Sequence, residues 1–243
     1  MIKRIIYISL FVFLTAGCSK SPGDCFTSTG TIVTESRETE AFRYLQMENN
    51  VDVFLSYSTA QSVEVRAGKN IISGIKTTVV DQTLTISNEN TCNWVRSYDK
   101  PIEVHISTSV LDSIVYQSSG NLTSSNQFIG DSLKLDILEG AGSIDLWIDM
   151  HRSMFNLSYG TADLTVRGYS HISHIYSEAY GPADLSNMRS VYTYLTNYST
   201  NNCYVWATLE LQVAIENVGD VYYWGDPPTV SKWGNGSGQL YKQ

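Results

Sequence analysis

Residues Tyr159–Val166 read YGTADLTV, and Tyr180–Ser186 nearly repeat them as YGPADLS. The shared phrase is a small or turn-forming residue, then a short polar residue, then an apolar one. A unit of about 20 residues is too short to close a hydrophobic core alone, so such units must stack on their neighbours. The apolar residue of the phrase recurs at intervals of 22, 20, 21, 18 and 18 residues: Leu122, Ile144, Leu164, Leu185, Cys203 and Val221.

Segments of alternating apolar and polar residues precede these phrases. In LELQVAIE, residues 209–216, the alternation predicts a strand with one face in a core and one in water. The repeated phrase occurs once per unit, and the same order of polar and apolar positions is kept after each copy. This pattern favours parallel coils joined at corners over a meander of hairpins. The sequence therefore predicts an all-β solenoid with coils of about 18–22 residues, spaced about 4.8 Å apart, whose six repeated apolar residues form one inner ladder.

The N-terminus has the layout of a secretory signal. Lys3 and Arg4 precede an apolar run, residues 5–14, which is short for a membrane span. The segment LTAGC ends at Cys18 and resembles a bacterial lipobox, with its Leu one place early. We expect residues 1–17 to be a lipoprotein signal peptide, Cys18 to be lipidated, and the mature protein to be anchored in the cell envelope, at the outer membrane, on either its periplasmic or its surface-exposed face.

The rest of the chain is expected to be a tether, residues 18–30, followed by one solenoid domain, residues 31–243. Its N-terminal part, residues 31–106, is less regular and forms either hairpins or early coils. Residues 107–243 contain the regular coils. No linker rich in proline and glycine divides the two parts.

Charge and cysteine content narrow the function. The net charge of −8 becomes about −10 once residues 1–17 are removed, which argues against nucleic acid and anionic membrane surfaces as partners.

Three cysteines remain besides Cys18. Cys25 and Cys92 lie in polar, turn-like contexts and are predicted to form a disulfide, whereas Cys203 occupies a repeat position that predicts a small buried side chain.

Several stretches resemble a known family. They are DCF near the start, AFRYLQMENNVDVFLS at 41–56, and CNWVRSYDKPIEVHIS at 92–107, of which CNWVRSY is the most specific. The chain is similar here to the family described as "putative auto-transporter adhesin, head GIN domain", over about Cys25 to Leu240. The resemblance implies a right-handed parallel β-helix at the envelope of a Gram-negative bacterium. It brings no catalytic or binding residues with it.

Asp163, Asp184 and Asp220 occupy the polar place of the repeated phrase. Stacked in register, two carboxylates would raise one pKa or recruit a cation. The equivalent places hold Asn121, Ser143 and Asn202, which can bond to turn amides and cannot ionise. A structural role in the turn is therefore favoured, with calcium binding and catalysis as minor alternatives.

Aromatic residues are the other candidate site. Tyr192 and Tyr194 alternate with Val191, Thr193 and Leu195, so one set must face outward, where tyrosine can stack on a sugar or anchor a protein. Trp147 lies on an outward face between two acidic residues. The alternative is a stacking ladder that stabilises the wall. His171 and His174, three residues apart, are expected on opposite faces of their strand and so cannot share a metal ion.

The sequence thus predicts a non-catalytic envelope lipoprotein that presents a polar and aromatic wall to a glycan or protein. No cofactor is expected, and the oligomeric state stays open. A β-helix enzyme acting on polysaccharide through outward carboxylates is the alternative. HExxH, CxxC and GxSxG motifs and a phosphate-binding Gly-Lys-Ser/Thr loop are absent from the sequence.

Overall fold

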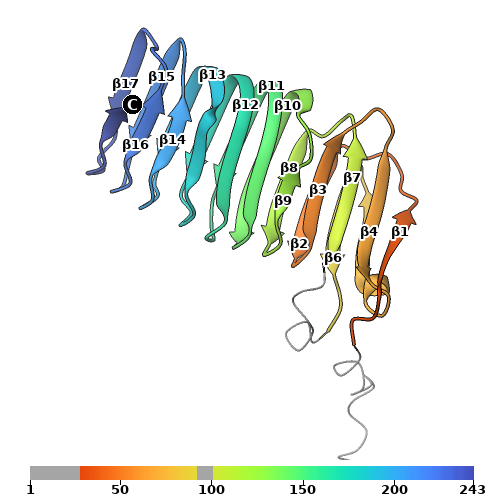
Figure 1. The fold of residues 1–243 in the computed structure, drawn as a ribbon. Coiled ribbons are helices and arrows are strands. Elements are labelled where there is room, and N and C mark those ends of the chain that lie inside the picture. The colour runs from red at the N-terminus through yellow and green to blue at the C-terminus, as the bar shows by residue number, and fades with distance from the viewer. Residues whose placement is uncertain (1–27, 92–100) are drawn as a thin grey trace, which may run out of the picture.

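The computed structural model describes residues 28–91 and 101–243 and shows a stack of β-strands that winds as a solenoid (Figure 1). Within these ranges the only helical element is a 3-10 turn at Ile72–Gly74. None of the described segments is a helix long and apolar enough to cross a bilayer. The predicted all-β solenoid is confirmed.

Two walls of parallel strands face each other across the core. Three long strands, β11 (Ser143–Leu157), β12 (Asp163–Ser177) and β13 (Ala183–Asn197), cross from one wall to the other. Their C-terminal halves form the first wall with β6 (Thr83–Asn88), β2 (Tyr44–Asn49), β8 (Ser113–Ser118), β10 (Phe128–Gly140), β15 (Glu210–Ile215) and β17 (Thr229–Trp233). Their N-terminal halves form the second wall with β7 (Glu103–Thr108), β3 (Asp52–Tyr57), β9 (Leu122–Ser124), β14 (Cys203–Trp206), β16 (Val221–Trp224) and β18 (Leu240–Lys242).

The long strands bend where small side chains line the inside of the corner. Ser153 and Ser173 are fully buried there and align in register, and Ser153 donates a 2.8 Å hydrogen bond to Ser170. Gly168 has φ +114°, and a Cβ at this position would lie 2.0 Å from the Ile148 carbonyl oxygen. The positive φ in β12 therefore requires glycine at position 168, whereas the aligned positions in β11 and β13 hold Ile148 and Met188. Small residues lie beneath the bend in all three strands: Ser153, Ser173 and Thr193.

The inner ladder of the second wall runs through every regular coil at intervals of 18 to 22 residues. Its register corrects the sequence prediction at one coil, because Ala183, and not Leu185, lies beside Leu164. A bulge in β13 after Asp184 adds one residue, and Leu185 is still buried, two positions further along the strand. The aligned residues are Leu122, Ile144, Leu164, Ala183, Cys203, Val221 and Leu240.

The N-terminal part contains both coils and hairpins. The coil formed by β2 and β3 is inserted in space between the coil of β6 and β7 and that of β8 and β9, although it comes first in the chain. Three pairs of strands are antiparallel at this end: β1 (Ile32–Arg37) with β4 (Ser62–Gly68), β4 with β7, and β5 (Ile75–Val80) with β6. These antiparallel strands cover the N-terminal end of the parallel stack.

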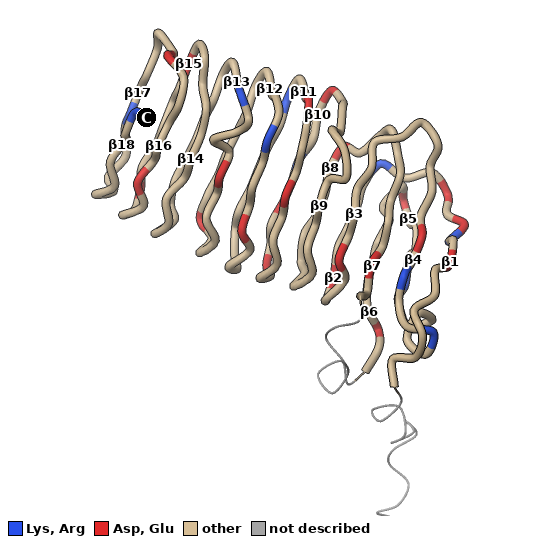
Figure 2. Tube along the Cα trace, in the orientation of Figure 1, with Lys and Arg blue, Asp and Glu red and all other residues tan. Residues whose placement is uncertain are grey.

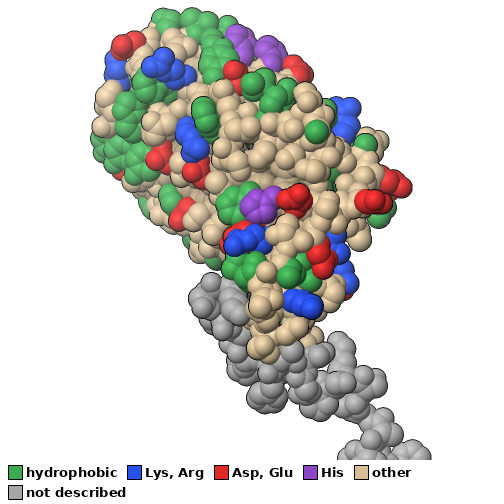
Figure 3. Space-filling view, turned by 45° about the vertical axis from the view of Figure 1, so that its right-hand side comes forward, with side chains coloured by type: hydrophobic (Ala, Val, Ile, Leu, Met, Phe, Trp, Pro, Cys, Tyr) green, Lys and Arg blue, Asp and Glu red, His purple; other side chains and the backbone are tan. Residues whose placement is uncertain are grey.

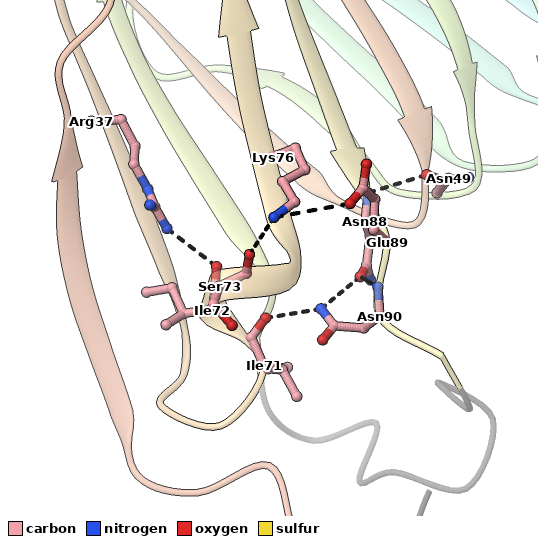
Figure 4. A network of polar contacts seen from close by, with 9 residues as sticks. All are labelled: Arg37, Asn49, Ile71, Ile72, Ser73, Lys76, Asn88, Glu89 and Asn90. Atoms are coloured by element: carbon pink, nitrogen blue, oxygen red, sulfur yellow. Dashed lines mark hydrogen bonds and ion pairs between the residues drawn. The ribbon is translucent and has the colours of Figure 1, made fainter. Parts of the chain in front are cut away.

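A polar network fastens the 3-10 turn to this end (Figure 4). Arg37 donates to the Ile72 carbonyl at 3.2 Å, and Lys76 donates to the Ser73 carbonyl at 2.8 Å. Asn90 donates to the Ile71 carbonyl at 2.9 Å, and the backbone N–H of Asn88 donates to Asn49 at 3.1 Å. Backbone carbonyls of the turn are thus satisfied by side chains from β1, from β5 and from Asn90, which follows β6.

Candidate functional site

The two predicted tyrosines face outward on the first wall. Thr193 and Leu195 are buried in β13, whereas Tyr192 and Tyr194 are half-buried on the outer side. The Tyr194 ring stacks on the imidazole of His174 in β12, with 5.0 Å between centroids and 22° between planes. Tyr192 instead meets the His171 ring edge-on, with 5.5 Å between centroids.

A groove lies next to Tyr194 on the outer side of the first wall. Along one row of aligned positions, Tyr176 is followed by the small residues Thr196 and Ala214, and then by Trp233 in the last coil. Because small side chains lie between two large aromatic ones, the wall is hollow there. Ala214 is only 4% exposed although it lies outside the inner core cluster, so the outer side chains cover it.

The groove has a volume of about 260 Å³. It is the space over the second half of β12, β13 and β15, closed at its far end by the edge strand β17. Three aromatic side chains, one imidazole and three neutral polar side chains surround it, and no Asp, Glu, Lys or Arg is among the described residues that line it. The lining residues are Met154, Asn156, His174, Ile175, Tyr176, Tyr194, Leu195, Thr196, Gln212 and Trp233.

Carboxylates beside the groove, on the same outer side of the wall, hold its polar groups in fixed orientations. The amide nitrogen of Gln212 donates to Glu210 at 2.5 Å, and that of Asn156 donates to Asp136 at 2.7 Å. The Tyr176 hydroxyl donates to Glu178 at 3.0 Å. Each amide therefore keeps its oxygen as an acceptor and a second N–H as a donor.

Burial and neighbouring charges keep the groove uncharged at neutral pH. Burial raises the pKa of Tyr194, and the carboxylate of Glu210 raises it further. Burial lowers the pKa of His174, and the guanidinium of Arg152 adds to this effect. The phenol therefore stays protonated and the imidazole stays neutral at pH 7.

Trp147 lies on the second wall and is not part of this groove. Its neighbours on β11 alternate as predicted, with Leu146 and Ile148 buried and the indole 38% exposed. The guanidinium of Arg167 lies 5.5 Å from the centre of the indole and forms an ion pair with Asp145. The arginine thus neutralises one of the two flanking carboxylates and covers part of the ring.

Family comparison gives the chain a place among known proteins. A family model described as "Putative auto-transporter adhesin, head GIN domain" matches residues 41–227. The chain belongs to this family. No curated protein matches it.

Solved structures similar to this head GIN domain protein share its fold at low sequence identity. A "putative adhesin" from Bacteroides fragilis NCTC 9343 has a TM-score of 0.79 and 18% identity, and the match covers 88% of this chain and 97% of that one. A "putative lipid binding protein" from Parabacteroides distasonis ATCC 8503 has a TM-score of 0.69 and 16% identity, with 89% and 98% covered. A "putative adhesin" from the same organism has a TM-score of 0.62.

The register of the head GIN domain solenoid does not stack Asp163 on Asp184, which corrects the arrangement on which the cation hypothesis depended. Asp163 aligns with Ser143, and Asp184 aligns with Thr165 and Tyr204. The Asp184 carboxylate accepts hydrogen bonds from the backbone N–H and the hydroxyl of Ser186, at 2.9 and 2.6 Å. The two acidic residues are therefore separate local features.

The prediction for the two histidines is also corrected. His171 and His174 are both half-exposed on the outer side, because the chain turns the corner between Ser170 and Ser173 and the strict alternation breaks there. His171 stacks on His151 of the preceding coil, with centroids 5.1 Å apart, whereas His174 stacks on Tyr194. In the part of the chain that the structure describes, no group of three or more His, Cys, Asp or Glu residues could hold a metal ion.

Sequence reasoning did not single out the groove residues Asn156, Tyr176, Gln212 and Trp233. Tyr176 aligns with Thr196 and Trp233 with Ala214, so the hollow exists only when four coils are stacked in register. The sequence signal for the hollow is one outward position that holds a large residue, two small ones and another large one in four successive coils. This signal becomes visible only when the coils are aligned with the bulge after Asp184 taken into account.

A second aromatic group lies on the outer side of the second wall. Tyr204 stacks on Tyr222 and Tyr222 on Tyr241, with 5.3 and 5.2 Å between centroids. The rings cover one another along the solenoid axis, so this group matches the stabilising ladder considered as the alternative. Figure 3 shows hydrophobic side chains gathered at the left end of this face, and Figure 2 shows acidic residues spread along the whole solenoid.

The predicted lipidation site Cys18 and the predicted disulfide between Cys25 and Cys92 lie outside the described residues. Cys203 is 1% exposed in the inner ladder, as predicted from its repeat position.

Proposed function

We propose that this protein is a non-catalytic cell-envelope lipoprotein, anchored in the outer membrane through a lipid on Cys18, that adheres to an external glycan or protein ligand. Its family is that of head GIN domain adhesins, and the N-terminal sequence has the pattern of a lipoprotein signal. The observation that supports ligand presentation most directly is the aromatic groove beside Tyr194 on the first wall.

The chemistry of the groove supports binding over hydrolysis. Glycoside hydrolysis needs two carboxyl groups about 5–10 Å apart that face the same bond. The described residues that line the groove include neither Asp nor Glu, and the carboxylates beside it are engaged with amide or hydroxyl donors. Aromatic faces with fixed polar groups are instead typical of binding sites.

The anchor is tested by mass spectrometry of the mature N-terminus. We expect cleavage before Cys18 and a mass increase that corresponds to acyl chains on that residue. A processed protein with unmodified Cys18 would contradict lipid anchoring, and a Cys18→Ala variant recovered in the soluble periplasmic fraction would support it.

Adhesion is tested with the mature protein coupled to beads and applied to a glycan array and to immobilised extracellular proteins. We expect retention of wild-type beads on at least one surface, and reduced retention of a Tyr192→Ala, Tyr194→Ala double variant. A Tyr159→Ala variant is the matched control, because Tyr159 is 64% exposed and lies outside the groove. Absence of retention for the wild type would refute the proposal.

A further inference from the structure

The first-wall groove has the features of a site for one small ligand. Its volume of about 260 Å³ lies just below the range of about 300–1,000 Å³ that is typical of pockets for drug-sized molecules. Tyr176 and Trp233 stand at opposite ends of the row that forms its floor, and Tyr194 stands beside it. A ligand in the groove would therefore have an aromatic side chain at each end and a third one beside it.

The polar groups of the groove select a ligand that donates hydrogen bonds. Gln212 and Asn156 each use one amide N–H to bond a carboxylate on the same outer side of the wall, which leaves the amide oxygen as an acceptor and the second N–H as a donor. Asp136 is itself paired with Lys134 at 2.7 Å, so its charge is compensated. Acceptors fixed in this way suit hydroxyl donors better than they suit another carbonyl-rich surface.

The absence of charged residues among the described lining residues selects a neutral ligand. An anionic ligand would meet the Glu210 and Glu178 carboxylates next to the lining, and a cationic ligand would lose its hydration while both carboxylates are already bonded to Gln212 and Tyr176, which is costly. The imidazole of His174 is covered on one face by Tyr194, and the opposite face of Tyr194 is directed toward the Gln212 position in the next coil. The Gln212 amide therefore lies next to the Tyr194 ring.

From these observations we infer that the groove binds a single neutral pyranose ring of a glycan over the small side chains of Thr196 and Ala214, with the apolar C–H face of the sugar against Tyr194 and Trp233 and a hydroxyl group donating to Gln212. Tyr and Trp offer large, rigid surfaces for such a contact, and the amide oxygen of Gln212 orients the ring. The inference depends on the proposed adhesive function and names the ligand class and the residues that recognise it.

The test is saturation-transfer NMR and tryptophan fluorescence on the mature protein with methyl glycosides of glucose, galactose, mannose and N-acetylglucosamine. We expect at least one glycoside to bind, and Trp233→Ala to weaken that binding at least tenfold. Trp233 is 50% exposed on an edge strand, so its truncation leaves the core intact. Gln212→Met, which keeps the side-chain length and removes the acceptor, should weaken binding as well.

Trp147→Ala is the matched control, since it removes an indole of similar exposure from the other wall, and we expect no change in affinity. Binding of tetramethylammonium or glucuronate in preference to all four neutral glycosides would overturn the inference, as would equal affinity of wild type and Trp233→Ala. If the beads adhere and the Trp233→Ala beads adhere equally well, the groove inference fails while adhesion stands. If a glycoside binds through Trp233 but no surface retains the beads, adhesion fails while the groove assignment stands.

Discussion

The ring of Tyr194 lies against the imidazole of His174, with 5.0 Å between their centroids and 22° between their planes. Burial, aided by the charge of Arg152, lowers the pKa of this imidazole below its ordinary value of 6.5. The folded protein therefore binds a proton at His174 less readily than the unfolded chain does.

This pKa shift makes stability depend on pH with a definite sign. The unfolded chain holds more protons between the folded pKa and about 6.5, so the free energy of unfolding falls as the pH is lowered through this window. We expect urea unfolding midpoints to fall from pH 7.5 to pH 5.5 by less in His174→Gln than in the wild type. A pH dependence identical in the two proteins would contradict this.

The register at Ala183 predicts where added volume is not tolerated. Ala183 is fully buried between Leu164 and Cys203, so Ala183→Leu should overpack the ladder and cost roughly 1–3 kcal/mol. Leu164→Ala should cost about 2–5 kcal/mol by leaving a cavity. Chemical denaturation measures both. The exposed Asp163→Asn is the control and should change stability by less than about 0.5 kcal/mol.

The polar residue of the repeated corner joins one coil to the next. Asp220 accepts a 2.7 Å hydrogen bond from the backbone N–H of Gln239, and Asn202 accepts one of 3.0 Å from that of Asp220. We expect Asp220→Ala to lower the free energy of unfolding by about 0.5–1.5 kcal/mol, and Asp220→Asn to retain most of it. Equal losses in both variants would show that the charge, not the acceptor, is what matters.

Lys232 lies in the edge strand β17 at the C-terminal end of the stack. It aligns with the inward residue Val213, and its ammonium donates to the Gly238 carbonyl at 3.1 Å and to Gln239 at 3.2 Å. A lysine on an edge strand opposes pairing with another chain. Lys232→Met should therefore self-associate in sedimentation velocity, whereas Lys134→Met, on the outer side of β10, should sediment as the wild type does.

The thiol of Cys203 should not react with alkylating reagents in the folded protein. Burial raises its pKa to about 11, so the reactive thiolate is scarce at pH 8. After iodoacetamide treatment, peptide mapping should find Cys203 unmodified in the native state and alkylated in 8 M urea. Rapid native alkylation would mean that the inner ladder opens locally.

The local pattern of residues was enough to predict the class of fold. Alternation in strands such as β15, and the recurrence of the corner phrase at Leu164 and Val221, require short strands that bury one face against a neighbour. The outward orientation of Trp147 followed from the same parity. These features depend on the period of two within a strand, which the order of residues determines alone.

The stacked structure decided everything that depends on which coil lies beside which. The inserted position of β2 and β3 joins residues 69 apart, as in the hydrogen bond from the Asn121 N–H to Asp52, and no local pattern encodes that choice. The pairing of β12 with β13 places Ala183 beside Leu164 and leaves Leu185 two residues further along the strand, so Asp163 does not lie beside Asp184. The groove at Trp233 exists for the same reason: a shift of register by one residue turns every following side chain to the opposite face, so only the tertiary pairing determines which outward residues meet.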